Sequence, residues 1–373
     1  MHLVFVLGTR PEIIKLSSLI SACIREGIHY TLIHTNQHYA ASMDSVFFDE
    51  LELPRAHFNL GVGSETATAQ LARMMMGIEP LLQTLQPDYV VVQGDTNSSL
   101  AGGLAANKLN IPVAHVEAGL RSYDKTMPEE VNRILLDHLS SFWFCPSALQ
   151  QRLLAKEGIQ GPHVHVTGNT GNDATLRHAR RAEQHSTIHS TLDLQPGRYL
   201  LLTCHRPGNT DDLGHFARLM TAVQRLADSL ERTVVFPVHP RLGHQHQQII
   251  GGQARIKAID PVTYLDLLAL LQGAQLVLTD SGGLQEEACV LQRPCLVLRA
   301  NTERPESLES GAARLAPVTT EYSLVEAEQS LRRVAINWSN PFGDGQASQR
   351  ILQVLAAHAV QMREVALPEP VSR

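Results

Sequence analysis

Short runs of β-branched and aliphatic residues alternate with longer segments of helical period along the first half of the chain. Apolar runs at 2–7, 30–35, 89–94 and 112–117 have the length and composition of buried strands. Between them lie segments such as 11–27, in which apolar residues recur three or four positions apart. This alternation predicts a parallel sheet with helices on both faces.

The same alternation begins again near residue 199. Strands are expected at 199–205, 233–239, 275–280 and 294–299, with helical segments such as 213–230 between them. The polar tract that precedes this second set is rich in His, Arg and Gln, which favours a surface connection and an exposed helix. The pattern therefore predicts two similar α/β halves.

The length of the chain supports this division, because 373 residues exceed the usual size of a single hydrophobic core. We place the N-terminal domain at 1–167 and the C-terminal domain at 168–351, with a connection that could extend to residue 195. An amphipathic helix is expected at about 352–366. Its apolar side needs a partner surface.

Composition and charge exclude several classes of protein. The net charge of −6 offers no basic face for nucleic acid or for an anionic membrane. The five cysteines are odd in number and scattered, which indicates reduced core residues. The first apolar run is too short for a signal peptide, and no window approaches 18 apolar residues. We expect a soluble cytoplasmic protein that binds neither nucleic acid nor membrane.

Polar and ionisable side chains directly follow several predicted strands. They are Asp95, Glu117, His205, His239 and Asp280. In parallel α/β sheets ligands bind beyond the carboxyl ends of the strands, so these side chains are expected to line a binding edge in each domain. A single acid there is equally well explained as a helix N-cap, but five such positions favour a ligand site. Two facing edges would form a cleft.

A phosphate site is expected at the turn that begins with Asp280. Gly282 and Gly283 allow the backbone to approach a ligand, and the Ser281 hydroxyl and free helical N–H groups supply donors. Glu287 is a candidate acceptor for a ribose hydroxyl, although acids in a first helical turn also suit the helix dipole.

A second anion-binding turn, GTRPE, follows the first predicted strand. It places Arg10 and Lys15 at the start of a helix, where both could face a bound anion. Short turns of this kind are common in proteins of every function. The motif therefore indicates anion binding only together with the turn at Ser281.

Cofactor and metal motifs are not found in the sequence. It contains neither G-x-G-x-x-G nor G-x-x-x-x-G-K-[ST], which disfavours dinucleotide-dependent oxidoreductases and P-loop enzymes. His244 and His246 follow His239 in a polar tract without nearby carboxylates, so we expect no metal site. His185 and His189 are interpreted as solvated surface residues.

Several of these motifs together resemble a known family. LGTRPEIIK, GDTNSSLAG, HVEAGLRS, CHRPGN, TDSGGLQEEA and RANTERPE occur in the order found in the non-hydrolysing UDP-N-acetylglucosamine 2-epimerases, and the matches run from about residue 3 to 350. The resemblance implies two Rossmann-like domains in the GT-B arrangement, an active site in the interdomain cleft, and a terminal helix that packs back on the first domain. It also implies a homodimer that needs neither cofactor nor catalytic metal.

The resemblance further implies roles for individual residues. Asp95, Glu117, Glu129 and His205 match the catalytic positions, Arg10, Ser281, Gly282 and Gly283 the diphosphate contacts, and Glu287 the ribose contact. Supporting positions are Lys15, Arg121, Arg133, His239, Arg299, Glu303 and Arg304.

The implied reaction interconverts UDP-N-acetylglucosamine and UDP-N-acetylmannosamine. The C2 hydrogen has no neighbouring carbonyl to acidify it, so UDP must leave as C2 loses its proton. Elimination gives a 2-acetamidoglucal and UDP, and UDP adds back with protonation on the opposite face. Such a site needs cationic and dipolar groups at the phosphates and anionic groups at the sugar. Which carboxylate serves which face stays open.

The chain departs from the family pattern in two places. The family often has an acid before the Asn in H-R-x-E-N, whereas Pro207, Gly208 and Asn209 follow here, which predicts a more flexible loop. The segment 37–43 keeps Gln37 and His38 of a segment that forms an allosteric substrate site in bacterial members, but it lacks the basic residue. Allosteric activation by substrate therefore stays open.

Four alternatives remain at this stage. A hydrolysing epimerase would let water capture C1 and release UDP with free N-acetylmannosamine. A relative that acts on diacetamido-uronic acid nucleotides is disfavoured by Leu120. A glycosyltransferase of the same fold would need an acceptor groove, and a non-catalytic sensor of nucleotide sugars would not need the acids at the strand ends.

Overall fold

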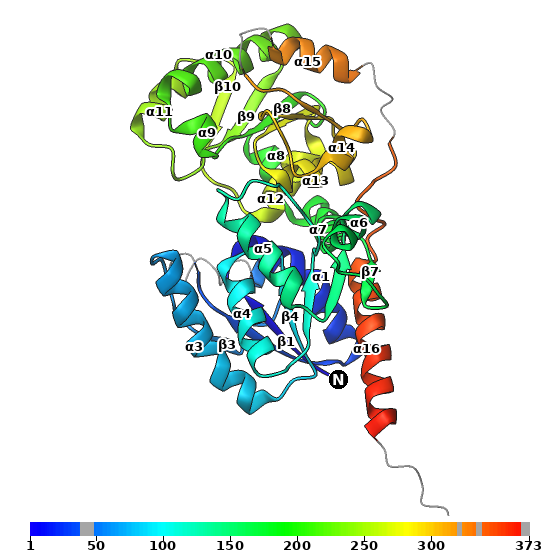
Figure 1. The fold of residues 1–373 in the computed structure, drawn as a ribbon. Helices are drawn as coiled ribbons and strands as arrows, with labels where there is room; N and C mark the ends of the chain where they lie inside the picture. Colours follow the sequence, from blue (N-terminus) through cyan, green and yellow to red (C-terminus); the bar gives the residue numbers. More distant parts are fainter. Residues whose placement is uncertain (38–47, 319–322, 333–337, 367–373) are drawn as a thin grey trace, which may run out of the picture. The chain divides into compact units, whose positions relative to one another are not determined.

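The computed structural model describes residues 1–37, 48–318, 323–332 and 338–366 (Figure 1). The chain divides into two compact units. Unit 1 comprises Met1–Ala174 and Gly343–Arg373, and unit 2 comprises Thr175–Phe342. The division lies between Ala174 and Thr175, within helix α7 (Thr170–His185), a few residues after the boundary expected at 167. Residues 38–43 of the expected allosteric segment lie outside the described residues.

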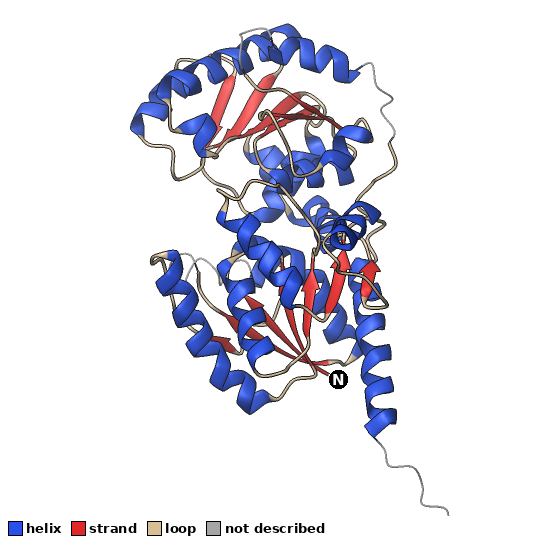
Figure 2. Ribbon diagram, viewed as in Figure 1, coloured by secondary structure: helices blue, strands red, loops and turns tan. Residues whose placement is uncertain are grey.

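Unit 1 contains a seven-stranded parallel sheet in the order β3-β2-β1-β4-β5-β6-β7 (Figure 2). Its central strands are almost wholly buried, which explains their continuous apolar sequences. The strands are β1 (His2–Leu7), β2 (His29–His34), β3 (Phe58–Asn59), β4 (Tyr89–Gln93), β5 (Val113–Val116), β6 (Phe142–Cys145) and β7 (Val164–Val166).

Helices cover both faces of this sheet. Helices α3 (Ala67–Leu85), α4 (Asn97–Lys108) and α5 (Pro128–Leu139) pack on one face, where Val4 and Val6 contribute to the core (Figure 1). Helices α1 (Arg10–Glu26) and α16 (Ala347–Ala366) contact each other. Helix α6 (Ala148–Lys156) follows β6. Alternate residues of β1 therefore serve opposite faces of the sheet.

The last helix, α16, belongs to unit 1 and begins earlier than the expected start at about 352. Ile351, Leu352 and Leu355 are buried, so the predicted apolar side is packed. The carboxylate of Asp173 accepts hydrogen bonds from the N–H groups of Ala347 (3.1 Å) and Ser348 (2.7 Å). This distant cap satisfies the first turn, so the helix can extend N-terminally beyond its apolar stripe.

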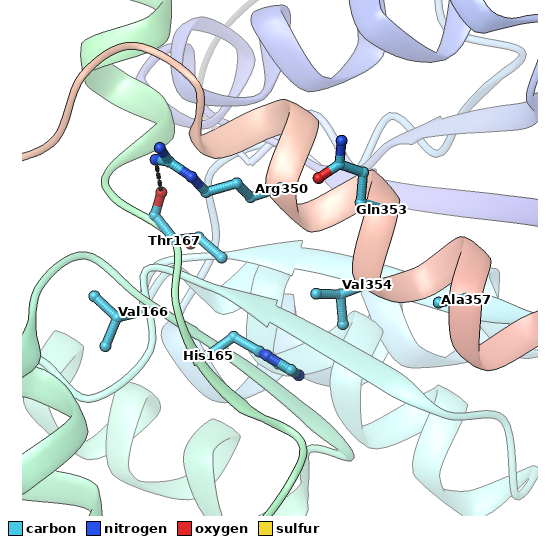
Figure 3. Close-up of a pocket in the computed structure, with 7 residues that line it drawn as sticks. All are labelled: His165, Val166, Thr167, Arg350, Gln353, Val354 and Ala357. Carbon is cyan, nitrogen blue, oxygen red and sulfur yellow. Dashed lines mark hydrogen bonds between the residues drawn. The ribbon is translucent and has the colours of Figure 1, made fainter.

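A surface pocket lies where α16 passes β7 (Figure 3). The guanidinium of Arg350 donates to the carbonyl of Thr167 at 3.1 Å and fixes the helix to the end of the strand. The pocket is lined by His165, Val166, Thr167, Arg350, Gln353, Val354 and Ala357, none of which belongs to the predicted site.

Unit 2 contains a six-stranded parallel sheet in the order β10-β9-β8-β11-β12-β13. The strands are β8 (Tyr199–Thr203), β9 (Thr233–Pro237), β10 (Ile256–Ile259), β11 (Leu276–Thr279), β12 (Cys295–Val297) and β13 (Ala313–Leu315). In both sheets the first three strands extend to one side and the later strands continue on the other side of the first strand, which is the Rossmann-type order. The four expected strands of this unit are found within two residues of their expected bounds, and β10 and β13 were not expected.

The helices of unit 2 lie on both sides of its sheet. Helices α10 (Leu213–Leu230), α11 (His244–Gly251) and α15 (Ser323–Arg332) share the larger apolar core with β8, β9 and β11. The remaining helices are α8 (Ile188–Thr191), α9 (Pro207–Thr210), α12 (Tyr264–Gly273), α13 (Gly282–Val290) and α14 (Pro305–Glu309).

Two expectations about the polar connection are wrong. Helix α7 is not an exposed helix throughout, because His178 is fully buried and Ala179 and Ala182 are nearly so. His189 is not a solvated surface residue either. Its Nε2 lies 2.9 Å from the Tyr199 hydroxyl, and burial lowers its pKa. His185 is exposed, as predicted. Helix α7 therefore has a packed side despite its polar sequence.

The five cysteines are buried as free thiols, which confirms their prediction as core residues. None of the helices among the described residues combines the length and the apolar character that crossing a bilayer requires.

Candidate active site

Glu117 is a buried acid of unit 1 with two hydrogen-bond partners. It follows β5 and is 6% exposed, and its Oε2 accepts hydrogen bonds from Lys15 Nζ (2.5 Å) and Gln93 Nε2 (2.6 Å). Its backbone has φ +68°, in the left-handed region that costs a non-glycine residue about 1–3 kcal/mol. The predicted residues Lys15 and Glu117 therefore meet at the carboxyl edge of the sheet.

Asp95 lies at the next loop of the same edge, between β4 and α4. Its carboxylate forms an ion pair with Arg133, and its side chain stays 26% exposed. Asn132 donates to the backbone carbonyl of Asp95 at 3.0 Å. The pair joins two predicted site residues, and it leaves the acid within reach of a ligand.

Two neighbouring acids open α5, and the structure separates them. Glu129, the predicted catalytic residue, is exposed. Glu130 is fully buried and accepts from the N–H groups of Ser122 (2.9 Å) and Tyr123 (2.8 Å). Burial works to raise the pKa of Glu130, but these hydrogen bonds and Arg133 together lower it. Glu130 therefore orders the loop that precedes α5.

Arg10 and Lys15 both belong to α1. Arg10 opens the helix and is exposed, whereas the Lys15 side chain is 17% exposed. Pro11 occupies the first turn, as the GTRPE motif predicts, and Thr9 and Glu12 form a capping box. The turn thus presents one cation to the surface and directs the other at Glu117.

Glu12 is a buried residue that sequence reasoning did not single out. Its Oε2 accepts from the N–H groups of Gly8 (3.0 Å) and Thr9 (2.8 Å), and its Oε1 from the hydroxyls of Thr96 (2.7 Å) and Ser99 (2.8 Å). Burial raises the pKa of Glu12, against these hydrogen bonds. The T-x-x-E spacing signals the cap, but not the link from the Arg10 loop to the Asp95 loop.

In unit 2, Asp280 organises the loop that carries His205. Its carboxylate accepts from the N–H groups of His205 (3.1 Å) and Arg206 (2.9 Å) and from Asn209 Nδ2 (3.1 Å), and His205 Nδ1 lies 3.2 Å away. Burial opposes ionisation, yet these partners lower the pKa of Asp280 to about 2. Asp280 is fully buried, so it anchors the loop from the interior of unit 2.

The loop with the unusual glycine is ordered by these bonds. Pro207–Thr210 forms the short helix α9, and Asn209 also donates to the carbonyl of Leu298 at 3.0 Å. A Cβ added at Gly208 would have no atom within 4 Å. Asp280 thus supplies an acceptor to this loop, and the greater flexibility expected of it stays a prediction.

The rings of His205 and His239 stack at 5.5 Å with an interplanar angle of 24°. The His205 side chain is 39% exposed, and His239 is exposed as well. Arg241 donates to the carbonyl of His205 at 2.8 Å and supports the pair. Two predicted residues from different strand ends of unit 2 are thus brought together.

The predicted phosphate turn has the expected local form. Ser281 is the N-cap of α13, and its Oγ accepts from the N–H of Leu284 at 3.4 Å. Gly282 and Gly283 open the helix, and a Cβ added at Gly282 would lie 3.7 Å from Glu303 Oε2. A helix N-terminus with small side chains suits a phosphate.

The acids and arginines around this turn form pairs. Arg304 pairs with Glu286, and Arg299 forms two hydrogen bonds with Glu303, at 2.8 and 3.0 Å. Although burial works against it, Arg299 lowers the pKa of Glu303 to about 2. Glu287 accepts from the hydroxyl of Tyr264 at 3.0 Å, a partner that sequence reasoning missed. These pairs hold the turn and its neighbouring side chains in place.

Known proteins are similar to this chain in sequence and in fold. The family model described as UDP-N-acetylglucosamine 2-epimerase matches residues 22–356. The UDP-N-acetylglucosamine 2-epimerase of Methanocaldococcus jannaschii is 44% identical over 362 residues, which cover 95% of this chain and 99% of that protein. The crystal structure of the enzyme from that organism, in complex with UDP-GlcNAc and UDP, aligns with a TM-score of 0.86 at 44% identity, over 96% of this chain and 100% of that one.

A relative with another substrate name is also similar. The UDP-2,3-diacetamido-2,3-dideoxy-D-glucuronate 2-epimerase of Pseudomonas aeruginosa is 37% identical over 359 residues, which cover 95% of this chain and 99% of that protein.

The predicted fold class, two Rossmann-like domains of the GT-B type, is confirmed by the two parallel sheets and by the solved relatives. The predicted enzyme class is confirmed as well, since the relatives are epimerases, which are isomerases. The chain therefore belongs to the UDP-N-acetylglucosamine 2-epimerase family.

Proposed function

We propose that this enzyme is a non-hydrolysing UDP-N-acetylglucosamine 2-epimerase, which interconverts UDP-N-acetylglucosamine and UDP-N-acetylmannosamine. The observation that carries the proposal is Glu117, a buried carboxylate fixed by Lys15 and Gln93 in a left-handed backbone conformation. A carboxylate held in this way is preorganised for proton transfer.

Removal of the proton at C2 needs such a base and also a leaving group. No carbonyl activates this position, so the C2 proton leaves together with UDP, and a 2-acetamidoglucal forms. UDP then adds back as C2 is protonated from the opposite face. The ammonium group of Lys15 lies 2.5 Å from the Glu117 carboxylate and orients it, which suits an acid or base. Asp95 and Glu129 are the other proposed acid or base groups.

Negative charge develops on the departing diphosphate. We assign its stabilisation to Ser281, Gly282, Gly283 and the N–H groups of α13, with His205 near the leaving group. Arg10 of unit 1 completes the proposed diphosphate contacts.

The remaining proposed contacts surround these groups. Glu287 accepts a hydrogen bond from the Tyr264 hydroxyl, and the same carboxylate can accept one from a ribose hydroxyl. Arg304 and His239 are proposed to support the nucleotide, and Arg133 orients Asp95. The chain's resemblance to the family also supports a homodimer. Sedimentation velocity at micromolar concentration tests this assembly, and a single species of monomer mass would refute it.

Proton NMR in D2O distinguishes the outcomes. Purified enzyme is incubated with UDP-N-acetylglucosamine, and we expect deuterium at C2, the N-acetylmannosamine epimer, and UDP still attached. Free N-acetylmannosamine with UDP would show a hydrolysing enzyme instead. No exchange without an added acceptor would favour a glycosyltransferase.

Two controls sharpen this experiment. Glu26→Gln changes an exposed acid near the end of α1 and is expected to leave the exchange rate unchanged. The diacetamido-uronic acid nucleotide is offered in competition with UDP-N-acetylglucosamine. Preferential turnover of that nucleotide would assign the chain to the other substrate class.

A further inference from the structure

A buried histidine lies directly behind Glu117. His115 is on β5, two residues before Glu117, and its side chain is 0% exposed. Its Nδ1 lies 2.8 Å from Oδ1 of Asp137 on α5, and its Nε2 lies 2.9 Å from the backbone carbonyl oxygen of Gly94. Both ring nitrogens therefore face oxygen atoms.

The chemistry of these partners fixes the hydrogens on the ring. A carbonyl oxygen only accepts, so Nε2 must donate to Gly94. Oδ2 of Asp137 accepts from Arg121 Nη1 (2.7 Å) and from the N–H of Gly119 (3.2 Å), so this carboxylate already serves as an acceptor. Burial alone would raise the pKa of Asp137, but His115 and Arg121 lower it. Because Arg121 pairs with this carboxylate, Oδ1 is an acceptor as well, and Nδ1 at 2.8 Å is placed to donate to it.

The surrounding charges can compensate a ring that donates from both nitrogens. Arg121 forms two further hydrogen bonds with Glu157, at 2.7 and 2.6 Å. Arg121 therefore links the carboxylates of Asp137 and Glu157, and the side chains of His115, Asp137 and Arg121 are at most 1% exposed. Buried charges persist when they are paired and hydrogen-bonded in this way.

The two backbone groups that the pair holds belong to the turns carrying the proposed acids. Gly94 directly precedes Asp95, and Gly119 follows Glu117 by two residues. Gly94 has φ +73° and Gly119 has φ +83°, so both turns use left-handed backbone. A Cβ added at Gly119 would lie 2.7 Å from the carbonyl oxygen of Gln150. The turns have little freedom, and the pair sets where they lie.

We propose that His115 and Asp137 form a positioning pair for Asp95 and Glu117, in which His115 donates from both ring nitrogens. The pair touches no substrate. It acts by fixing the carbonyl before one acid and the N–H after the other. The catalytic consequence rests on the proposed function, whereas the hydrogen count on the ring does not.

Nitrogen NMR tests the hydrogen count in the ligand-free enzyme. The protein is labelled with ¹⁵N-histidine, and His115 is assigned from nuclear Overhauser contacts to neighbouring residues, so no variant is needed. At pH 7.5 we expect both His115 nitrogens to show the shifts of protonated imidazole nitrogens, unlike the exposed His185. One nitrogen with the shift of a bare lone pair would overturn the proposal.

Kinetics of Asp137→Asn and His115→Gln test the positioning role. Misplacing a reacting group by about 1 Å can cost about 10²-fold in rate. We expect kcat to fall by about 10- to 10²-fold while KM changes less than about threefold, because the proposed nucleotide contacts lie mostly in unit 2. Circular dichroism and melting temperature verify that each variant is folded.

His358→Gln is the matched control. It removes a hydrogen bond of similar kind, between His358 Nδ1 and the Tyr89 hydroxyl at 2.6 Å, from a part-buried place outside the site. We expect it to lower the melting temperature and to leave kcat unchanged. If Asp137→Asn and His115→Gln behave in the same way, the pair is merely structural and the positioning role is refuted.

The two proposals fail separately. If the wild-type enzyme shows no C2 exchange, the proposed function fails, and with it the catalytic part of this inference, while the nitrogen spectrum still decides the state of His115. If exchange is normal and both variants keep wild-type kcat, the epimerase assignment stands and the positioning role alone is lost.

Discussion

At the scale of single residues, two of the proposed acids of unit 1, Glu117 and Asp95, depend on neighbours that hold them. Lys15 and Gln93 hold Glu117, and Arg133 holds Asp95. These contacts fix side chains whose loops use left-handed backbone conformations. Catalytic function should therefore respond both to removal of the acids and to removal of their supports.

Removing the charge of the acids should abolish most activity. Asp95→Asn and Glu117→Gln are each expected to lower kcat by at least about 10²-fold, which is the usual contribution of an acid or base. Glu129→Gln is expected to lower kcat as well. Rates are followed by NMR of the UDP-sugars. A variant with a near-normal rate removes that residue from the mechanism.

Glu12→Gln should cost both stability and activity. An amide NH2 group would replace an oxygen that now accepts from donors on two loops. We expect the free energy of unfolding to fall by about 1–3 kcal/mol, because buried donors lose their acceptor. Urea denaturation measures this change. Ser99→Ala, which removes one donor and keeps the carboxylate, is the control, and an equal loss there would contradict the argument.

At the scale of elements, the carboxyl ends of strands and the N-termini of helices have different roles. Strands supply buried apolar surface, and the loops at their carboxyl ends carry several residues of the proposed site. Helix N-termini need acceptors, and the structure meets this need in unit 1 with a carboxylate from a distant part of the chain. Asp173 caps α16 across more than 170 residues of sequence.

Asp173→Asn is expected to lower the free energy of unfolding by about 1–2 kcal/mol, the usual cost of losing a good helix cap. Thermal and urea denaturation measure the loss. Asp344→Asn is the matched control. Its carboxylate pairs with Arg350 on the surface, where such pairs contribute about 0–1 kcal/mol. A larger effect at Asp344 than at Asp173 would show that the cap does not stabilise α16.

The sequence predicts most of the fold, because buried parallel strands need continuous β-branched runs and leave a clear pattern. It does not predict which of two adjacent acids faces inward. Glu129 and Glu130 share one helical turn, as do Glu286 and Glu287, and their surroundings come from distant loops and helices. The burial of His178 was missed for the same reason, since its partner Tyr264 lies on α12.

At the scale of the whole molecule, buried neutral histidines make stability depend on pH. Burial lowers the pKa of His34 to about 4, and burial, with Arg177 and Arg181, lowers that of His178 to about 3. The unfolded chain binds these protons near pH 6.5, whereas the folded protein does not until much lower pH. Their contribution to stability is complete above pH 6.5 and is lost as the pH falls towards 4.

We therefore expect the free energy of unfolding to fall between pH 6.5 and pH 4.5, by about 1 kcal/mol per pH unit for each of these histidines. Urea denaturation at a series of pH values measures the slope. His178→Phe should reduce the slope, and His185→Phe, at an exposed histidine, should not. An unchanged slope in His178→Phe would remove that residue from the acid sensitivity.

The return of the chain to unit 1 has a consequence for biosynthesis. Helix α16 follows unit 2 in the sequence but belongs to unit 1, whose other elements precede unit 2. Unit 2 is therefore translated between the two parts of unit 1. Unit 1 therefore cannot complete its packing until unit 2 has been translated. Until then the surface of α1 that α16 contacts stays exposed to water.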